Sequence, residues 1–292
     1  MSTDPDICTV FIGPTVSGSW SAMEAMTEAI GRESAVDLSA YTAGLKPGEF
    51  PSLQRMLEVE RDNLRQRAAF PVFINTHDPI PIHVCFPERK FRYITLLRNP
   101  VRRFISYYHY CALWKDHDLH WVSPVIRAGA TLEQYVDFVM KTGFFPGGLV
   151  PGDYFYKPWA QLGLIPQQFV DHNQIYKGSC HVLETYFEVV GITEMFDESL
   201  FVFSRMLGLK EPPKWRMRGK SGVKHAAIAA TVRDKVKHIV QGEMALYTMF
   251  VERFLEKHRR DIELFKSMGI SLRMEGDEDR VDGPAEPAQG GD

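Results

Sequence analysis

Apolar residues along this chain gather in short runs that alternate with longer amphipathic segments. Residues 7–12, 70–75 and 91–97 are rich in apolar and β-branched side chains, which predicts strands buried on both faces. Helical spacing of apolar residues is found at about 21–30, 52–68, from 101 onward, and at 131–140, 197–207 and 228–257. Strands that alternate with helices predict an α/β fold, with a mainly parallel central sheet flanked by helices.

The remaining segments have a weaker pattern. Residues 179–182 and 187–190 are short strand candidates, and residues 31–50 are interpreted as a loop or a substrate-facing insertion. Residues 143–152 are rich in Gly, Pro and Phe, which predicts an irregular loop. Residues 275–292 hold Gly, Pro and acids with few apolar side chains, a composition typical of disorder. We therefore expect one domain over residues 1–274, followed by a disordered acidic tail.

One junction between a predicted strand and a predicted helix carries candidate chemistry. The apolar run ends at Arg98, and Asn99 and Pro100 follow. Asn is a favoured N-cap, and Pro suits the first helical position. The pattern therefore places a guanidinium at the carboxyl edge of a sheet beside a helix start, where anions bind. Ser106, about two turns into the helix, can supply a hydroxyl near the same anion.

This junction resembles a known phosphate-binding segment. The pattern Arg-x-Pro-x-x-Arg-x-x-Ser-x-Tyr, formed by Arg98, Pro100, Arg103, Ser106 and Tyr108, is similar to the 3′-phosphate-binding segment of sulfotransferases. The carbohydrate branch that includes the heparan sulfate 2-O and 6-O enzymes is most similar. The resemblance implies a P-loop-like sulfotransferase architecture and the donor 3′-phosphoadenosine 5′-phosphosulfate (PAPS). It also implies that Arg98 and Ser106 hold the 3′-phosphate of that donor.

A second candidate segment follows the first predicted strand. A strand, a Gly/Ser loop and a helix in sequence can hold a phosphate through backbone N–H groups. Gly13 and Gly18 have the Walker A spacing, but Ser19 and Trp20 replace the Lys-Ser/Thr pair. This replacement disfavours a P-loop kinase or ATPase with magnesium. Sulfotransferases use a similar loop to hold the 5′-phosphosulfate without a metal, and the resemblance assigns to it Pro14, Thr15, Val16, Ser17, Gly18, Ser19 and Trp20.

Thr15 departs from the resembled pattern, because the family has a lysine at this position of the loop. A preorganised cation there stabilises the charge that develops on the leaving oxygen by a few kcal/mol, whereas a hydroxyl donates one neutral hydrogen bond. Three explanations stay open. Another cation enters the site, the loop alignment is shifted, or the protein binds PAPS without efficient transfer.

His77 is the candidate general base. Thr76, His77 and Asp78 follow the predicted strand at 70–75, so His77 should emerge at the same sheet edge as Arg98. A histidine has a near-neutral pKa and can remove a proton from a hydroxyl. The segment resembles the family's His-x-Pro element, in which the histidine is the base. Asp78 is expected to orient the imidazole or to act as a second base.

Three later segments extend the resemblance to roughly residues 7–254, which is most of the chain. Residues 191–200 resemble the family's strand-to-helix element after the donor site, and Glu243 to Tyr247 resemble its C-terminal helix. Residues 216–224 form a basic, glycine-containing stretch. This stretch is either a solvated loop or one that closes over the 3′-phosphate, with Lys220 and Ser221 as the expected contacts.

Composition limits the remaining possibilities. The chain of 292 residues has a formal net charge of −3 and four scattered cysteines, so neither general nucleic-acid binding nor a disulfide framework is indicated, and no metal is expected. The polar N-terminus and the lack of a long apolar run indicate no signal peptide or membrane span, which favours a cytoplasmic enzyme. We expect sulfuryl transfer from PAPS to a hydroxyl acceptor, a carbohydrate or small hydroxylated molecule, with adenosine 3′,5′-bisphosphate as product. The alternative is a non-catalytic PAPS-binding sensor or scaffold. The oligomeric state is left open.

Overall fold

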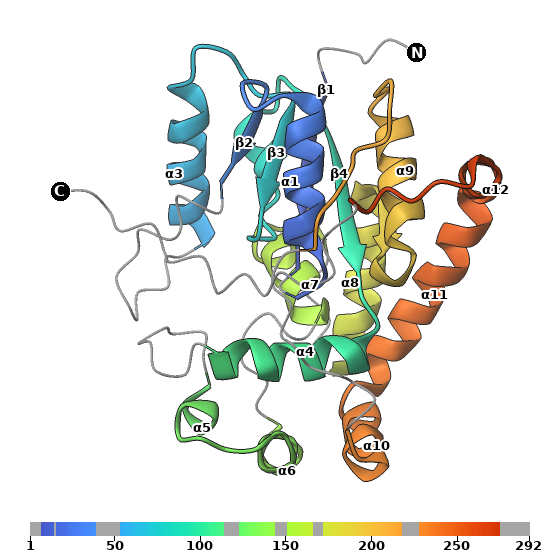
Figure 1. The fold of residues 1–292 in the computed structure, drawn as a ribbon. Helices are drawn as coiled ribbons and strands as arrows, with labels where there is room; N and C mark the ends of the chain where they lie inside the picture. The colour runs from blue at the N-terminus through green and yellow to red at the C-terminus, as the bar shows by residue number, and fades with distance from the viewer. Residues whose placement is uncertain are drawn as a thin grey trace.

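The computed structural model describes residues 7–14, 16–38, 53–113, 123–143, 151–165, 172–217 and 228–274. Its centre is a five-stranded sheet with the order β2-β3-β1-β4-β5 (Figure 1), in which all neighbours are parallel. The strands are β1 (Ile7–Ile12), β2 (Ala35–Asp37), β3 (Phe73–Thr76), β4 (Lys90–Leu97) and β5 (Phe187–Ile192). The predicted α/β class with a parallel sheet is confirmed.

The strand order creates a crevice at the carboxyl end of β1. β1 lies between β3 and β4, and Ile12 is in register with Thr76 on one side and Thr95 on the other. The Thr95 hydroxyl donates a hydrogen bond of 2.6 Å to the Ile12 carbonyl. From β1 the chain continues to β2 and β3 on one side of β1, and it then crosses past β1 to β4 and β5 on the other side. The connections that follow β1 and β4 therefore lead toward opposite edges of the sheet. Open α/β sheets bind ligands in such a crevice.

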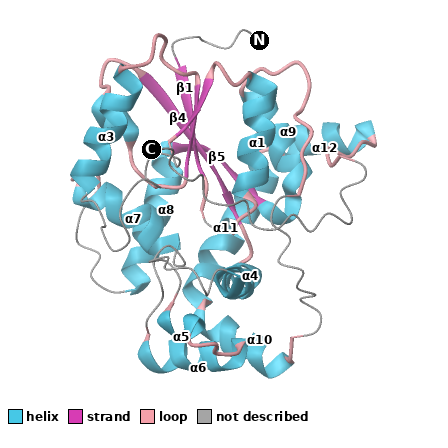
Figure 2. Ribbon diagram, turned by 60° about the vertical axis from the view of Figure 1, so that its left-hand side comes forward, coloured by secondary structure: helices cyan, strands magenta, loops and turns pink. Residues whose placement is uncertain are grey.

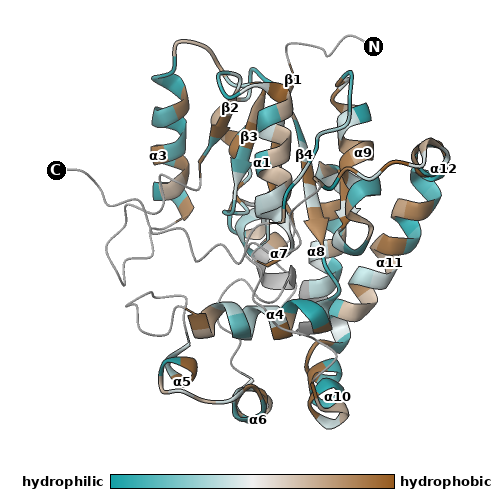
Figure 3. Ribbon diagram, in the orientation of Figure 1, coloured by the Kyte–Doolittle hydropathy of each residue, from teal (hydrophilic) through white to brown (hydrophobic). Residues whose placement is uncertain are grey.

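Helices cover both faces of the sheet (Figure 2). One side carries α1 (Ser19–Ile30), α9 (Phe196–Met206) and α12 (Arg259–Met268), and the other carries α3 (Leu53–Arg65), α7 (Pro151–Gln161) and α8 (His172–Tyr186). α11 (Gln241–Lys257) packs against β5 and α8. α11 and α12 carry both hydrophobic and hydrophilic residues along their length (Figure 3), as expected of helices with one face on a core.

Helix α4 (Pro100–Leu113) follows β4 and lies across the carboxyl edge of the sheet (Figure 1). Beyond it lie α5 (Pro124–Arg127), α6 (Leu132–Thr142) and α10 (Ala230–Ile239). These helices share with α4 a second apolar cluster, which includes Phe104, Tyr135 and Val236. α4 is therefore held between the sheet edge and a separate helical layer.

Two predictions about elements were wrong. Residues 179–182 belong to α8 rather than to a strand, and the buried positions Ser179, Val182 and Leu183 of this helix recur at helical spacing. A short apolar run does not by itself distinguish a strand from a helix. Residues 31–50 include the edge strand β2, which is only three residues long. The predicted loop at 143–152 ends where α7 begins, and residues 144–150 lie outside the described part.

Two further features complete the fold. The short 3₁₀ helices η1 (Ile82–Cys85) and η2 (Thr193–Met195) follow β3 and β5. Among the helices that the structure describes, none is long and apolar enough to cross a membrane. The predicted tail at 275–292 lies outside the described residues, and the assignment of residues 1–274 to one domain stays a prediction.

Candidate functional site

The loop between β1 and α1 is fixed by hydrogen bonds to its neighbours and to itself. The Gly13 N–H donates to the Thr76 carbonyl at 2.8 Å, which ties the loop to the end of β3. The hydroxyls of Ser17 and Ser19 donate to the Pro14 carbonyl at 2.6 and 3.1 Å. Both serine hydroxyls therefore hold the loop in its shape, a role that the sequence did not reveal.

Both loop glycines are required by geometry. A Cβ on Gly13 would lie 2.5 Å from the Cβ of Ser19. Gly18 has φ of 78°, in the left-handed region, and a Cβ there would lie 3.2 Å from the Phe196 ring. Val16 also has a left-handed φ, 54°, and a non-glycine residue in this region is a strained conformation that clusters at functional sites.

The start of α1 carries no side-chain cap. Gly18 is the N-cap residue, it makes no capping hydrogen bond, and the first turn has no acidic residue. The first N–H groups of any helix lack partners within the helix, and they carry a partial positive charge. The start of α1 can therefore receive an anion at the crevice of the sheet.

His77 contacts this loop from the end of β3. Its Nδ1 lies 2.7 Å from the Gly13 carbonyl oxygen. A carbonyl only accepts, so Nδ1 carries the proton and donates, which leaves Nε2 of the neutral ring as the basic nitrogen. The Trp20 ring stacks on the imidazole, with ring centroids 5.5 Å apart and an interplanar angle of 2°. This tautomer is the one that a general base acting through Nε2 needs.

Arg98 contacts the same loop from the end of β4. Its Nη1 donates a hydrogen bond of 2.8 Å to the Val16 carbonyl. Burial lowers the pKa of this guanidinium, while the nearby Glu194 carboxylate raises it. The same short loop therefore accepts one hydrogen bond from His77 and another from Arg98. Both side chains lie at the sheet edge where the sequence predicted them.

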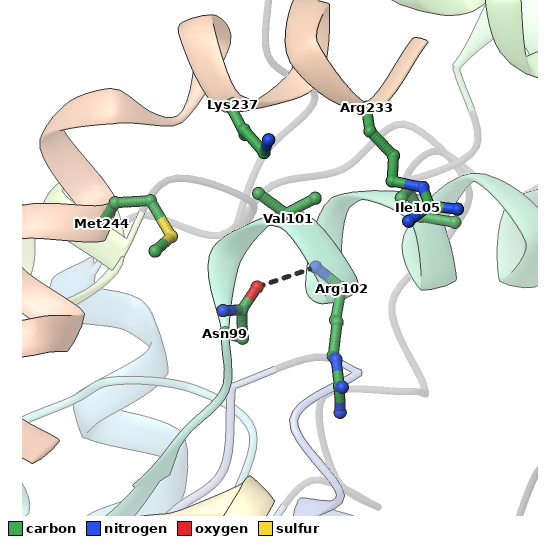
Figure 4. A pocket seen from close by; sticks show the side chains of 7 residues that line it. All are labelled: Asn99, Val101, Arg102, Ile105, Arg233, Lys237 and Met244. Atoms are coloured by element: carbon green, nitrogen blue, oxygen red, sulfur yellow. Dashed lines mark hydrogen bonds between the residues drawn. The ribbon is translucent and has the colours of Figure 1, made fainter. Parts of the chain in front are cut away.

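The start of α4 is capped by protein groups. The Arg102 N–H donates to Asn99 Oδ1 at 3.2 Å (Figure 4), so Asn99 is the N-cap residue, as predicted. The Asn99 N–H donates to both carboxylate oxygens of Glu194, at 3.1 and 3.2 Å, and the Tyr247 hydroxyl donates to Glu194 at 2.7 Å. In the described structure, the Glu194 carboxylate therefore occupies the helix start at which the sequence predicted an anion.

A buried ion pair fixes α4 to α11. Arg103 Nη2 lies 3.1 Å from Glu243 Oε2, and the two side chains are 4% and 2% exposed. Burial raises the pKa of the Glu243 carboxyl, and Arg103 offsets part of that rise. Arg103 thus has a structural partner, and the three segments that resemble sulfotransferases at Arg98–Tyr108, 191–200 and 243–247 contact one another.

The other predicted site residues lie as follows. Ser106 is in α4 with its side chain buried. Asp78 is half-buried, and its N–H donates to the Thr76 hydroxyl at 2.9 Å. Thr15, Lys220 and Ser221 lie outside the described residues. The roles predicted for these side chains stay predictions.

Two aromatic residues that sequence reasoning missed lie beside the loop. The Phe196 ring is next to Gly18, and it packs against the Trp215 ring with centroids 4.5 Å apart. The Trp215 Nε1 donates to the Asp197 carboxylate. Trp215 precedes the basic stretch that contains Lys220, so the chain enters that stretch close to the start of α1. Phe196 lies within the family-like residues 191–200, which was the available signal.

A cavity of about 430 Å³ lies on the outer side of α4 (Figure 4). Arg102 points away from Arg233 and Lys237 (Figure 4). Lys237 pairs with Asp234 at 2.8 Å, and the Arg233 guanidinium donates to the Ile228 carbonyl. Since these cationic side chains do not point toward a common position in the cavity, their arrangement does not form an anion-binding site. Within the described ranges no group of three or more His, Cys, Asp or Glu side chains is arranged to hold a metal ion.

Comparisons with known proteins identify the family. The family model described as "Sulfotransferase domain" matches residues 10–164, which is more than half of the chain. The chain therefore belongs to the sulfotransferase family, and this membership indicates sulfuryl transfer in general. Among solved structures it is similar to a sulfotransferase from Alicyclobacillus acidocaldarius, with 13% identity over 91% of this chain and 100% of that chain and a TM-score of 0.43. No curated protein matches. The heparan sulfate branch stays a prediction.

Proposed function

We propose that this protein is a PAPS-dependent sulfotransferase that transfers a sulfuryl group to a hydroxyl acceptor. One observation carries the proposal. His77 and Arg98 bind two carbonyls of the same loop, at Gly13 and Val16, beside the uncapped start of α1. A basic nitrogen, a cation and a helix start then face one crevice, which is the set of groups that transfer from an anionic donor to a hydroxyl needs.

We assign each charged group of PAPS to residues along this crevice. Residues Pro14 to Trp20 and the start of α1 bind the 5′-phosphosulfate through backbone N–H groups. Arg98 and Ser106 bind the 3′-phosphate, and Lys220 and Ser221 close over it. The position of Trp215 beside Phe196 and Gly18 supports the last assignment, because it brings the chain toward the donor just before the basic stretch.

His77 removes the acceptor's hydroxyl proton through Nε2 while Gly13 holds Nδ1. The acceptor oxygen forms a bond to sulfur as the bond between sulfur and the phosphate oxygen breaks. Adenosine 3′,5′-bisphosphate leaves with the released electron pair, and the partial positive charge of the α1 start stabilises it. Asp78, next in the chain, is assigned to orientation of the base.

A non-catalytic PAPS-binding protein is the second candidate. Its support is Thr15, which replaces the lysine that resembled enzymes carry. Arg98 weakens this alternative, because its guanidinium reaches the carbonyl of the residue directly after Thr15. A cation beside the loop can take over part of the charge stabilisation that Thr15 lacks.

Sulfur-labelled PAPS tests both candidates through separate measurements of binding and transfer. We expect His77→Ala to retain donor binding and to lose transfer by about 100-fold or more. We expect Arg98→Ala to weaken donor binding by about tenfold or more. His181→Ala on α8 and Arg260→Ala on α12, both exposed, are the matched controls. Donor binding without transfer to any acceptor in a broad panel supports the second candidate, and failure to bind PAPS or its bisphosphate product contradicts both.

A further inference from the structure

A groove of about 360 Å³ runs between α1 and the edge strand β2, which lie side by side (Figure 1). Its volume is at the lower end of the range for small-molecule sites. The polar and aromatic side chains that line it are Trp20, Glu24, Thr27, Glu28, Arg32, Asp37 and Asn75. No residue of this groove apart from Trp20 belongs to the donor site assigned above.

The groove carries an excess of negative charge. Among the described residues that line the groove, Glu24, Glu28 and Asp37 supply three carboxylates and Arg32 supplies one guanidinium. Arg32 and Glu28 are 3.9 Å apart, and their side chains are 80% and 56% exposed. An exposed pair at this distance neutralises little. A cation in the groove is therefore attracted, and an anion is repelled.

Asn75 provides an independent indication of a ligand. The side chain is 3% exposed, and its Nδ2 donates to the Thr27 hydroxyl at 2.7 Å. Its Oδ1 has no hydrogen-bond partner in the described part of the chain. A buried acceptor without a partner is costly, and native proteins contain few of them. A ligand N–H or O–H group that reached this buried oxygen would satisfy it.

The groove leads to the proposed general base. Asn75 precedes His77 by two residues on the same strand end, and Asp37 of β2 is in register with Asn75. Trp20, which lines the groove, stacks on the His77 ring and is 52% exposed. An acceptor that occupies the groove therefore extends toward the imidazole that would deprotonate it.

We infer that this groove binds the acceptor and selects a hydroxyl compound that carries a protonated amine, such as an amino sugar. The inference rests on the proposed function for its chemistry and on the groove alone for its charge preference. The carboxylates attract the ammonium group, Asn75 Oδ1 accepts a hydrogen bond from it or from a hydroxyl, and the face of Trp20 adds a cation–π contact. A uronic acid is disfavoured by the same carboxylates.

Three sugars of different charge, one cationic, one neutral and one anionic, test the inference. With labelled PAPS, we expect kcat/KM for glucosamine to exceed that for N-acetylglucosamine by about tenfold, and glucuronate to be the poorest acceptor. Glu28→Gln should reduce this preference by about threefold. Glu33→Gln, an exposed carboxylate outside the groove, should leave the preference unchanged. Equal rates for the three sugars, or a preference for glucuronate, overturn the inference.

Calorimetric titration of the same sugars into donor-free protein separates this inference from the proposed function. Preferential binding of glucosamine that weakens in Glu28→Gln supports the groove, even if PAPS does not bind. Absent or charge-independent sugar binding in a protein that binds PAPS normally overturns the groove and leaves the proposed function standing.

Discussion

Two helices begin at the same edge of the sheet, and their starts are built in opposite ways. α1 follows β1 with a glycine N-cap and no capping side chain. α4 follows β4 with Asn99 bound to the Arg102 N–H and with Glu194 bound to the Asn99 N–H. Pro100, which has no N–H, occupies the first helical position. The early N–H groups of α4 are thus largely satisfied by protein, whereas the N-cap residue of α1 makes no side-chain capping hydrogen bond.

The difference makes the start of α1, rather than the start of α4, the better candidate to bind an anion. A strand followed by a helix indicates an anion site at either position. Only the start of α1 keeps its partial positive charge available, because Glu194 already neutralises the start of α4. At the second position Arg98, rather than the helix, is the group able to bind an anion.

Two buried carboxylates elsewhere in the protein also differ in whether a protein group is paired with them. Glu243, beneath α4, has the buried partner Arg103. Glu60 of α3 is 1% exposed, and within the described ranges neither of its oxygens makes a hydrogen bond of acceptable geometry, although the Asn63 amide is close enough to stabilise the ionised form in part. Burial raises the pKa of Glu60 to about 7; the Asn63 side chain lowers it in part, and Asp78 and Asp37 raise it further. The Glu243 carboxylate is therefore stabilised by its ion pair with Arg103, whereas ionisation of Glu60 lowers the free energy of unfolding.

The largest expected effect concerns the ion pair beneath α4. Arg103→Met should lower the free energy of unfolding by about 3–5 kcal/mol, because it leaves the Glu243 carboxylate buried without a partner. Urea unfolding at pH 8 measures the change. The double variant Arg103→Met with Glu243→Leu should recover most of the loss, since it removes both charges. A double variant as unstable as Arg103→Met would contradict the pairing.

The next largest effect is expected from a substitution that makes the start of α1 resemble the start of α4. Gly18→Asp introduces a carboxylate at the bare N-cap, and Gly18→Asn introduces the same shape without charge. Both share the strain of a left-handed residue beside Phe196. We expect Asp to weaken PAPS binding about tenfold to 100-fold more than Asn, through repulsion of the donor. Equal affinities in the two variants would show that the α1 start does not bind the donor's anion.

The features predicted from sequence were those that lie within a few residues of one another. Arg98, Asn99 and Pro100 form a local strand-to-helix signal, and the structure confirms the cap at Asn99. The five parallel strands also follow from local apolar runs, except for β2, which is too short to show a period. Local patterns were therefore sufficient to predict the fold class and the strand-to-helix junction at Arg98, Asn99 and Pro100.

The partners that distinguish the two helix starts could not be predicted in this way. Glu194 is 95 residues from Asn99, and Glu243 is 140 residues from Arg103. Such contacts depend on how α9 and α11 pack around β5, which no local spacing encodes. Gly13, 64 residues from His77, is likewise the group that fixes the imidazole tautomer, where sequence reasoning had considered only Asp78.

Glu60→Gln should have an effect of opposite sign to the ion-pair variants. The carboxyl is protonated in both states below pH 4.5, whereas above pH 7 the folded state must ionise it at a cost. Stability from this group is therefore present at low pH and is lost as the pH rises through about 7. We expect the variant to be more stable than wild type by about 3 kcal/mol at pH 8 and nearly equal to it near pH 4.5. Destabilisation at pH 8, measured by urea unfolding, would show that Glu60 has a partner when ionised.

The smallest effect tests whether the cap of α4 is only structural. Glu194→Gln keeps an oxygen that can accept from the Asn99 N–H but removes the charge at the helix start, which should cost about 0.3–1 kcal/mol of stability. PAPS affinity should stay within about threefold of wild type, in contrast to Gly18→Asp. The exposed Glu211→Gln serves as the control for loss of one negative charge. If Glu194→Gln changes PAPS affinity tenfold while Glu211→Gln does not, Glu194 acts on the donor through Arg98, and the start of α4 belongs to the binding site as well.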